Sequence, residues 1–494
     1  MGRRVPDGKK QLRRATDRRT PARLFLELRA NGDGSTDALT GLRILALVLL
    51  FGFLYPLTVF AVSVFESPMA FVRPWLQPWY VTGMMWGLGL IIFIVVLYLA
   101  RHYLFTLNRL FGTQRFPYVD VETADWPAVT VLIPAHNEEQ VIGRIIRALL
   151  AADYSQDRLT IVPIDDRSTD KTAAVIAELA EENSHLIRPY FRRGGEGGKG
   201  AALRDAMLRV ETDVVLVFDA DYMPGEGLIK QLAAPFFDPE VGAVMGRVVP
   251  SNVDTNLLTR LLDLERSGGY QVDQQARMNL RLVPQYGGTV GGIRRSALDS
   301  VGGWKTDTLA EDTDATYRLL LGGWKTVYQN RSECHEEVPE EWDQRLRQVV
   351  RWARGHNQSL ARYAIPLLFN KKTEFWEKVD GTLLLGVYFM SPIMLVGWGL
   401  AMTLWYLGYN NPSIWVLLAV ACYSTVGNFA TFFEVAAATH LDGTRQRARL
   451  IPYISMGFLI SVLAVTGATL KQLIPRRPGR AFTWHKTARK GDAR

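Results

Sequence analysis

The chain has 494 residues, of which 48% are hydrophobic and 21% charged, and its formal net charge is +8. This length exceeds what one small domain requires, so a single small fold is excluded. The two cysteines, Cys334 and Cys422, are far apart and the second lies in an apolar segment, so neither a disulfide framework nor a cysteine zinc site is suggested.

Positive charge gathers at the two ends, in a basic arm predicted over 1–42 and a basic tail predicted over 473–494. Such clusters also occur in proteins that bind nucleic acids. Here both clusters flank apolar segments and follow the positive-inside rule, so we expect no nucleic-acid partner. Arg43 and Arg101-His102 mark the predicted cytoplasmic ends of the first two spans, which places the arm and the central domain in the cytoplasm.

Four segments lack charged residues and are long enough to cross a bilayer, for which about 20 apolar residues suffice. They cover residues 44–65, 74–100, 381–433 and 450–470. Buried core helices are the alternative, but core helices rarely run this long without charge. We predict two transmembrane helices within 43–103 and a C-terminal transmembrane group within 381–472.

The number of C-terminal crossings stays open. Segment 381–433 is too long for one crossing and is expected to fold as a hairpin near 409–412. Three crossings after a cytoplasmic domain would put the basic tail outside, against the positive-inside rule. Either a fourth crossing exists, or one apolar segment is interfacial or re-entrant.

Residues 125–341 alternate strand and helix patterns, which predicts an α/β domain inserted between the membrane segments. The strands are expected at 129–133, 159–164 and 214–218, and the helices at 141–151 and 171–181. This order predicts a mostly parallel sheet, in which ligands bind beyond the carboxyl ends of the strands.

Residues 342–375 interleave arginines with apolar residues, a pattern typical of amphipathic helices at a membrane surface. Helical spacing puts Gln348, Arg351 and Trp352 on one face. A guanidinium suits phosphate oxygens, so Arg351 is a candidate ligand for a diphosphate, and Trp352 is a candidate to stack on a sugar ring. A plain membrane-facing surface is the alternative for both side chains.

Asp219-Ala220-Asp221 follows directly on the strand expected at 214–218. A hard divalent cation such as Mg²⁺ or Mn²⁺ prefers carboxylate oxygens and bridges them to phosphate. Such an ion stabilises a diphosphate leaving group. A bare Asp-x-Asp is common in solvated turns, but the preceding buried strand favours a metal site here.

Glu311 and Asp312 form a second pair of carboxylates, near the start of an expected helix. Either could act as a general base that takes the proton of an attacking hydroxyl. Helix capping by acidic residues is the alternative. The glycine-rich stretch 194–200 does not have the spacing of a phosphate-binding P-loop and predicts a flexible loop that places Lys199 near a nucleotide.

These motifs occur in a fixed order: Pro134-Ala-His-Asn-Glu138, Asp165-Asp-Arg-Ser-Thr-Asp170, Gly198-Lys-Gly-Ala-Ala202, Asp219-Ala-Asp221, Ala310-Glu-Asp312 and Gln348-x-x-Arg-Trp352. The ordered set resembles the membrane-integrated glycosyltransferases of family 2, which include synthases of cellulose, chitin, hyaluronan and poly-N-acetylglucosamine. The resemblance implies a GT-A (Rossmann-like) fold and an inverting, single-displacement reaction that uses Mg²⁺ or Mn²⁺.

The resemblance also implies roles for single residues. The nucleotide sugar would be bound by Pro134, His136, Glu138, Asp166, Lys199, Asp219, Gln348 and Arg351. Asp219 and Asp221 would hold the metal, and Asp312, with Glu311 beside it, would be the catalytic base. Trp352, Gly288 and Thr289 would face the acceptor. Two positions depart from the family pattern, because Ala310 replaces a frequent Thr and His136 stands where some synthases have an aromatic residue.

The resemblance therefore predicts a processive synthase in the bacterial inner (plasma) membrane, which extends a β-linked polysaccharide from a UDP-sugar and moves it through its own spans. The main alternative is transfer of one or two sugars to a membrane lipid without secretion. A transporter or binding protein without catalysis is a third possibility, but the predicted spans contain almost no ionisable groups.

Overall fold

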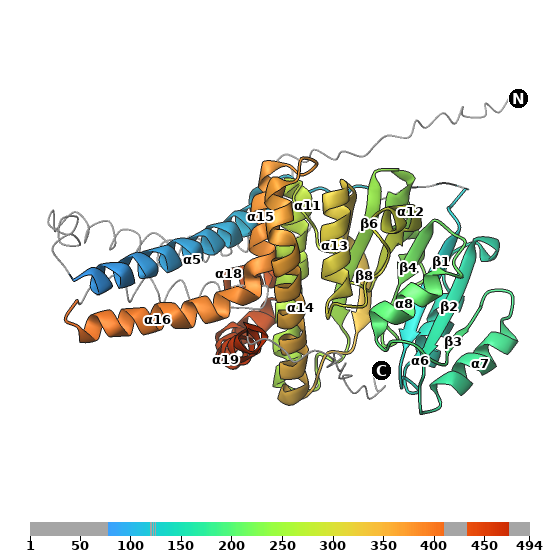
Figure 1. The fold of residues 1–494 in the computed structure, drawn as a ribbon. Helices are drawn as coiled ribbons and strands as arrows, with labels where there is room; N and C mark the ends of the chain where they lie inside the picture. The colour runs from blue at the N-terminus through green and yellow to red at the C-terminus, as the bar shows by residue number, and fades with distance from the viewer. Residues whose placement is uncertain (1–77, 119–120, 122, 124, 410–431, 474–494) are drawn as a thin grey trace, which may run out of the picture.

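The computed structural model describes residues 78–118, 121, 123, 125–409 and 432–473 (Figure 1). The predicted basic arm, the apolar segment at 44–65, the basic tail and Cys422 lie outside the described residues. Most of the hairpin expected near 409–412 lies outside them too, so the question of the C-terminal crossings stays a prediction.

One eight-stranded sheet forms the centre of the described domain. Its strands are β1 (Val129–Ala135), β2 (Leu159–Asp166), β3 (Tyr190–Arg192), β4 (Val214–Val217), β5 (Met223–Pro224), β6 (Val241–Pro250), β7 (Gly291–Arg294) and β8 (Lys325–Glu336). They lie in the order β3-β2-β1-β4-β7-β6-β8-β5. The three strands predicted from apolar runs correspond to β1, β2 and β4.

The sheet is mostly parallel, as predicted, but three antiparallel pairings make it mixed. β1 pairs in parallel with β2 and β4, β2 pairs in parallel with β3, and β6 pairs in parallel with β8. β7 is antiparallel to both of its neighbours, β4 and β6, and β5 is antiparallel to β8. The parallel half still brings the carboxyl ends of β1, β2 and β4 to one edge, where the predicted ligand-binding residues follow the strands.

Helices cover both faces of the sheet. They are α6 (Ile142–Leu150), α7 (Thr172–Glu182) and α9 (Leu228–Ala233) on one face, and α8 (Lys199–Met207), α12 (Arg295–Ser300) and α13 (Glu311–Gly322) on the other. Strand side chains alternate between the two cores, as the pleat requires: Val131 packs with the first group and Leu132 with the second. Short 3₁₀ turns lie at Gln156–Arg158 and Ala234–Phe237.

A second group of helices lies beside the sheet domain (Figure 1). It consists of α10 (Leu257–Ser267), the π-helical turn η5 (Gly268–Gln274), α11 (Gln275–Leu280), α14 (Trp342–Phe369), α15 (Phe375–Gly386), η6 (Val387–Phe389), α18 (Phe432–Leu441), η7 (Arg445–Tyr453) and α19 (Ile454–Leu473). α10, η5 and α11 follow one another without a break. A π-helical turn inside a helix is rare and is frequent at functional sites.

Within the described residues, two helical stretches are long and apolar enough to cross a bilayer, by length and composition: Trp79–Phe111 and Phe375–Tyr406. The first is α5, and the second comprises α15, η6 and α16 (Met390–Tyr406). α5 and α16 project together from the rest of the molecule (Figure 1) and pack through apolar side chains such as Val95 and Met394. Their outer faces expose large apolar side chains such as Trp86 and Tyr406.

Candidate active site

A cavity of about 750 Å³ lies beyond the carboxyl ends of the parallel strands. Nearly all of the residues predicted from the motifs line it, although they are spread over more than two hundred positions. They are Pro134, His136, Glu138, Asp166, Lys199, Asp219, Asp221, Thr289, Glu311, Asp312, Gln348, Arg351 and Trp352. Gly288 does not line the cavity itself, but a Cβ added there would lie 3.0 Å from the Cβ of Asp312.

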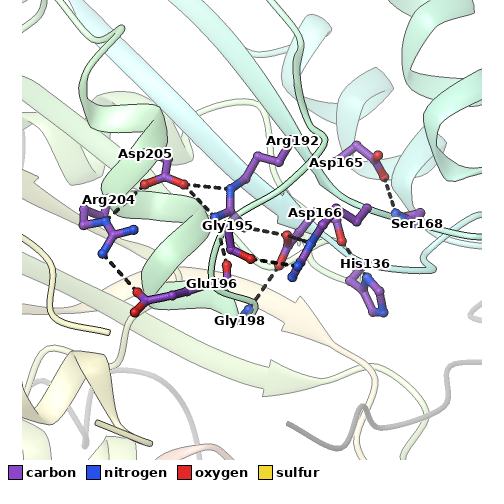
Figure 2. A network of polar contacts seen from close by, with 11 residues as sticks. His136, Asp165, Asp166, Ser168, Arg192, Gly195, Glu196, Gly198, Arg204 and Asp205 are labelled. Atoms are coloured by element: carbon purple, nitrogen blue, oxygen red, sulfur yellow. Dashed lines mark hydrogen bonds and ion pairs between the residues drawn. The ribbon is translucent and has the colours of Figure 1, made fainter. Parts of the chain in front are cut away.

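Asp166 lies at the end of β2 and is the centre of a polar network (Figure 2). Its carboxylate accepts hydrogen bonds from Nη1 of Arg192 at 2.5 Å, from Nε of Arg167 at 3.0 Å and from the backbone N–H of Gly198 at 3.1 Å. The ring Nδ1 of His136 lies 2.7 Å from the Asp166 carbonyl oxygen. The network thus ties β2 to the loop that precedes Lys199, and it forms the wall at one end of the cavity.

Arg192 and Arg167 were not among the predicted site residues. Arg192 is almost fully buried and also forms an ion pair with Asp205 at 2.6 Å, so it links Asp166 to α8 (Figure 2). Its position two residues before the glycine-rich stretch 194–200 was a usable signal, because that stretch carries the predicted site residue Lys199.

Asp219 and Asp221 follow β4 and enter the middle of the cavity. The backbone N–H of Asp219 donates to Oγ1 of Thr289 at 3.0 Å, and its Oδ1 lies 2.5 Å from Nζ of Lys199. Burial by itself lowers the pKa of Lys199, but the neighbouring carboxylates of Asp219 and Glu311 outweigh it and raise that pKa. Lys199 is therefore a fixed positive charge beside Asp219.

The residues at this position fit a divalent cation. The donor set is two carboxylates, the hard oxygen ligands that Mg²⁺ and Mn²⁺ prefer. The ammonium of Lys199 lies against Asp219, so a bound ion would share this carboxylate with Lys199. Asp219 and Asp221 would supply the protein ligands, and the remaining ligands would come from diphosphate oxygens and water.

Glu311 and Asp312 begin α13 and also line the cavity, with Glu311 next to the segment that carries Lys199 and Gly200. The Asp312 carboxylate accepts a hydrogen bond from the backbone N–H of Thr313 at 2.7 Å. Burial raises the pKa of the Glu311 carboxyl; the Lys199 charge opposes this rise and the adjacent Asp312 adds to it. Gly288 has a φ of +73° and passes close to Asp312, an approach that a larger residue would block.

α14 contributes Gln348, Arg351 and Trp352 to the cavity. Oε1 of Gln348 accepts from Nη1 of Arg345 at 2.8 Å, and the Arg345 guanidinium also lies 5.1 Å from the centre of the Trp352 ring. A second guanidinium, that of Arg266 from α10, lies 5.3 Å from the same ring. Both distances are within the range of a cation–π interaction.

A buried chain of polar contacts joins Trp352 to the segment that follows Asp221. The hydroxyl of Tyr222 donates to Glu336 at 2.8 Å, and Nε of Arg266 donates to the other Glu336 oxygen at 2.7 Å. Arg266 and Glu336 were not predicted. They come from segments without a motif, and no sequence signal separates them from other buried ion pairs.

The remaining wall of the cavity is formed by η5, α11 and the residues next to them. It contains Asp273, Gln274, Arg277, Gln285 and His356. Gln285 donates through Nε2 to Oγ1 of Thr313 at 2.9 Å, and its Nε2 lies 3.4 Å from Nε2 of His356. Burial lowers the pKa of His356. This polar wall lies next to Asp312, because Gln285 contacts the adjacent Thr313.

The domain that carries this cavity is similar to known proteins. Residues 127–355 match the family model described as "Glycosyltransferase like family 2". Among curated proteins, the chain is 32% identical over 265 residues to the probable glycosyltransferase YdaM of Bacillus subtilis. The aligned residues cover 53% of this chain and 62% of YdaM. It is 33% identical over 244 residues to the beta-monoglucosyldiacylglycerol synthase of Synechocystis, covering 49% of this chain and 51% of the synthase.

A third relative is the probable glucomannan 4-beta-mannosyltransferase 1 of Arabidopsis thaliana, 31% identical over 269 residues, with 53% of this chain and 48% of that protein covered. The chain thus spans about half to three fifths of the length of these relatives.

Among solved structures, the fold is similar to that of the mannosyltransferase PcManGT from Pyrobaculum calidifontis, determined in complex with GDP-Man and Mn²⁺. The TM-score is 0.51 at 19% identity, over 80% of this chain and 99% of that one. Together, the matching family model, the similar fold and the cavity identify residues 127–355 as a glycosyltransferase domain of family 2 with a GT-A-like fold.

Proposed function

We propose that the chain is an integral membrane glycosyltransferase that moves a sugar from a nucleotide sugar to a hydroxyl of a growing β-linked polysaccharide, with inversion at the anomeric carbon. One observation supports this most directly. A single cavity joins the paired carboxylates Asp219 and Asp221 to a third carboxylate, Asp312, and to a polar wall. This wall, called the acceptor wall below, consists of Asp273, Gln274, Arg277, Gln285 and His356. Such a cavity has room for a donor diphosphate and for an acceptor hydroxyl at the same time.

In this proposal the donor occupies the end of the cavity formed by β1, β2 and β4. Asp166 and His136, with Pro134 and Glu138, contact the nucleoside. Asp219 and Asp221 hold Mg²⁺ or Mn²⁺, which when bound neutralises the charge that develops on the departing diphosphate. Lys199 and Arg351, with Gln348, add positive charge and hydrogen-bond donors around the phosphate oxygens.

The acceptor enters from the side of Trp352, Gly288 and Thr289, next to Asp312. The Asp312 carboxylate takes the proton of the acceptor hydroxyl as its oxygen forms a bond to the anomeric carbon. The bond from that carbon to the diphosphate oxygen breaks in the same step, and the electron pair leaves with the nucleoside diphosphate. Attack opposite the leaving group inverts the anomeric configuration, so an α-linked donor gives a β-linked product.

A sugar chain as acceptor is supported by the acceptor wall, because carboxylate, amide and imidazole groups at a cavity wall suit the many hydroxyls of a saccharide. It is also supported by the Gln-x-x-Arg-Trp motif and by the two candidate membrane helices that adjoin the domain. We extend the proposal to translocation of the polymer through the membrane helices, to a cytoplasmic catalytic domain over 125–341 and to location in a bacterial inner membrane.

Transfer to a membrane lipid without secretion is the second candidate. It is favoured by the similarity to the beta-monoglucosyldiacylglycerol synthase, a protein named for a lipid product. Product analysis of the purified chain in bilayers distinguishes the two candidates, because a short glycolipid without polymer supports the lipid reaction and excludes the synthase.

The first prediction concerns turnover. The full chain, purified in detergent or bilayers, is offered UDP-glucose, UDP-N-acetylglucosamine, UDP-galactose and GDP-mannose, and the released nucleoside diphosphate is measured. We expect one donor to be preferred, turnover to stop after chelation with EDTA, and turnover to return with Mg²⁺ or Mn²⁺. Asp312→Asn should lower kcat by roughly 10²–10⁴-fold, because removal of a general base has effects of that size.

Asp299→Asn is the matched control, since Asp299 is an exposed aspartate on α12 whose contact is an ion pair with Arg295. It should leave turnover unchanged. Full activity of Asp312→Asn would remove the role given to that carboxylate. Turnover that is unaffected by EDTA would remove the metal from Asp219 and Asp221.

A further inference from the structure

Six titratable side chains form a buried network where the membrane helices meet the catalytic domain. They come from α5, η5, α11, α15 and α18, and each side chain is at most 9% exposed. The buried charge network consists of Arg101, His102, Asp273, Arg277, Asp380 and Glu434. The sequence predicts that Arg101-His102 marks the cytoplasmic end of the second span. In the structure both side chains are buried inside the protein, and α5 continues to Phe111.

The core of the network is a closed ring of two arginines and two aspartates. Arg101 contacts Asp273 at 3.0 Å and Asp380 at 2.8 Å. Arg277 contacts the same two carboxylates, at 2.7 Å and 3.3 Å. The ring is balanced in charge, and removal of one buried member leaves the others without compensation.

His102 extends the network from α5 to α18, because its Nδ1 lies 2.8 Å from Oε1 of Glu434. His102, Glu434 and Asp273 also bring ligand atoms within 4.8 Å of one another, an arrangement compatible with a metal ion. Asp273 is already neutralised by two arginines, however, so a further cation there would meet two positive charges at short range. The contacts therefore favour an ion-pair network.

Two members of the network also line the catalytic cavity, namely Asp273 and Arg277, whereas Arg101, Asp380 and Glu434 do not. The π-helical turn η5 carries Asp273 and the adjacent Gln274. The side chain of Gln274 then forms two hydrogen bonds of 2.9 Å with the backbone of Gln285, one donated and one accepted.

The connection continues from Gln285 to the proposed base. The Gln285 side chain donates to Thr313 at 2.9 Å, and the Thr313 backbone N–H donates to Asp312 at 2.7 Å. Nη1 of Arg277 donates to Oε1 of Gln274 at 3.4 Å, so a series of polar contacts runs from α5 and α15 through Arg277 and Gln274 to the first turn of α13. No comparable series from the described membrane helices reaches the nucleotide end around Asp166.

We propose that Arg101, Asp380 and Glu434 are positioning residues, through which the membrane helices set the acceptor wall and the orientation of Asp312. The inference rests on the proposed function and adds that different parts of the structure position the donor and acceptor ends of the cavity. The donor end is positioned by the sheet, and the acceptor end is positioned by the membrane helices. Disturbing the network outside the cavity should therefore weaken use of the acceptor and leave donor binding unchanged.

The test compares Arg101→Met, Asp380→Leu and the double variant in the full chain. The donor is the nucleotide sugar preferred in the four-donor screen, and the acceptor is a short β-linked oligosaccharide of the same sugar. Each single variant should raise the acceptor KM about tenfold and change the donor KM, measured with water as acceptor, by less than about twofold. The double variant removes one charge of each sign, so its acceptor KM should lie within about threefold of the unaltered value.

Arg294→Met is the matched control for the loss of a buried arginine. Arg294 is 13% exposed, pairs with Asp213 and donates to three backbone carbonyls away from the cavity. It should lower the Tm without moving either KM. Arg101→Lys keeps the charge and provides a variant that folds if Arg101→Met does not; its acceptor KM should be intermediate.

Equal changes in both KM values, or no change in the acceptor KM of Arg101→Met and Arg101→Lys, would overturn the positioning role. A double variant whose acceptor KM is raised as much as in the single variants would overturn the charge-balance argument. A metal ion that the purified chain binds stoichiometrically, and that Glu434→Gln loses, would overturn it as well. If the unaltered chain turns over none of the four donors, the proposed function fails first. If it turns over a donor and these variants behave like Arg294→Met, only the positioning role fails.

Discussion

At the scale of single residues, two guanidinium groups lie over the indole of Trp352, and this contact connects the two ends of the cavity. The Arg266 guanidinium, from α10, lies over the Trp352 ring and also donates to the Glu336 carboxylate. The same carboxylate accepts a hydrogen bond from the Tyr222 hydroxyl. Tyr222 directly follows Asp221. Two hydrogen bonds and one cation–π contact therefore link the residue after Asp221, a proposed metal ligand, to Trp352, the residue proposed to meet the acceptor.

Arg266→Met tests this connection. The substitution leaves the Glu336 carboxylate buried without its arginine, a change that destabilises proteins by about 3–5 kcal/mol. We expect a lower Tm and an acceptor KM raised about tenfold, since the Trp352 ring loses one of its two cation contacts. Thermal unfolding and acceptor titration measure the two effects.

Arg347→Met is the comparison variant, because Arg347 lies on the same helix as Trp352 but is half exposed and pairs only with Asp343 among the ion pairs described. It should change neither quantity. An Arg266→Met protein with an unaltered acceptor KM would show that Trp352 needs no support from α10.

At the scale of elements, α14 approaches α13 unusually closely. A Cβ added at Gly355 would lie 2.4 Å from the Cβ of Ala310 and 2.9 Å from its backbone nitrogen. Ala310 directly precedes Glu311 and Asp312. It stands at the position where Thr is frequent in the family that the sequence resembles. Because residues 355 and 310 are glycine and alanine, the helix that carries Trp352 packs directly against the turn that precedes the proposed base.

Gly355→Ala should therefore move α14 away from α13 and lower kcat about tenfold or more, because small displacements of catalytic groups have large effects. The double variant Gly355→Ala with Ala310→Gly removes the Cβ–Cβ clash and should recover part of the lost rate. Gly399→Ala is the control, since nothing lies within 4 Å of a Cβ at that position in α16. A Gly355→Ala enzyme with unaltered kcat would contradict the close packing.

Among the strands, β1, β2 and β4 could be predicted from the sequence and β7 could not. β1, β2 and β4 were predictable because each is a run of β-branched or other apolar residues. β7 begins with Gly291-Gly292, and Cβ atoms there would lie 2.5 Å from the Val244 carbonyl oxygen and 2.6 Å from Leu216. Tight packing selected glycines, which have low strand propensity, so the antiparallel strand that makes the sheet mixed was not visible.

The residues of the candidate site also fall into a group that could be predicted from the sequence and a group that could not. The motif residues lie directly after predictable strands, and the topology of the sheet brings those strand ends together. Arg266, Glu336, Asp273 and Gln285 reach the cavity through tertiary packing of segments that have no periodic or motif signal. The π-helical turn that places Asp273 has no sequence signature either.

At the scale of the whole molecule, the helix group that includes α14 separates the sheet domain from the projecting pair α5 and α16 (Figure 1). The outer faces of this pair expose Trp79, Leu90 and Trp405 among other large apolar side chains. In a bilayer, aromatic residues near helix ends suit the headgroup region and the apolar middle suits the hydrocarbon core. The arrangement supports the proposal that the pair spans a membrane.

Membrane fractionation tests this proposal. The full chain should stay in the membrane pellet through alkaline carbonate and high-salt washes and leave it only with detergent. Leu90→Arg should reduce the membrane-integrated yield, since an arginine near the centre of a span costs about 2.5–3.5 kcal/mol. Leu208→Arg, at an even more exposed leucine on the sheet domain, should have no such effect. Release of the unaltered chain by carbonate alone would exclude a spanning arrangement.

The division of the cavity between two structural groups has an evolutionary consequence. The nucleotide wall is built from the ends of β1, β2 and β4, and the acceptor wall from η5, α11 and α14. Most side chains of the two walls come from different segments of the chain, so substitutions that alter the donor preference can be confined to positions outside the acceptor wall, and the reverse. We expect descendants of such a scaffold to diversify in donor and acceptor independently, and chimaeras that join the two walls from different relatives to combine the two preferences.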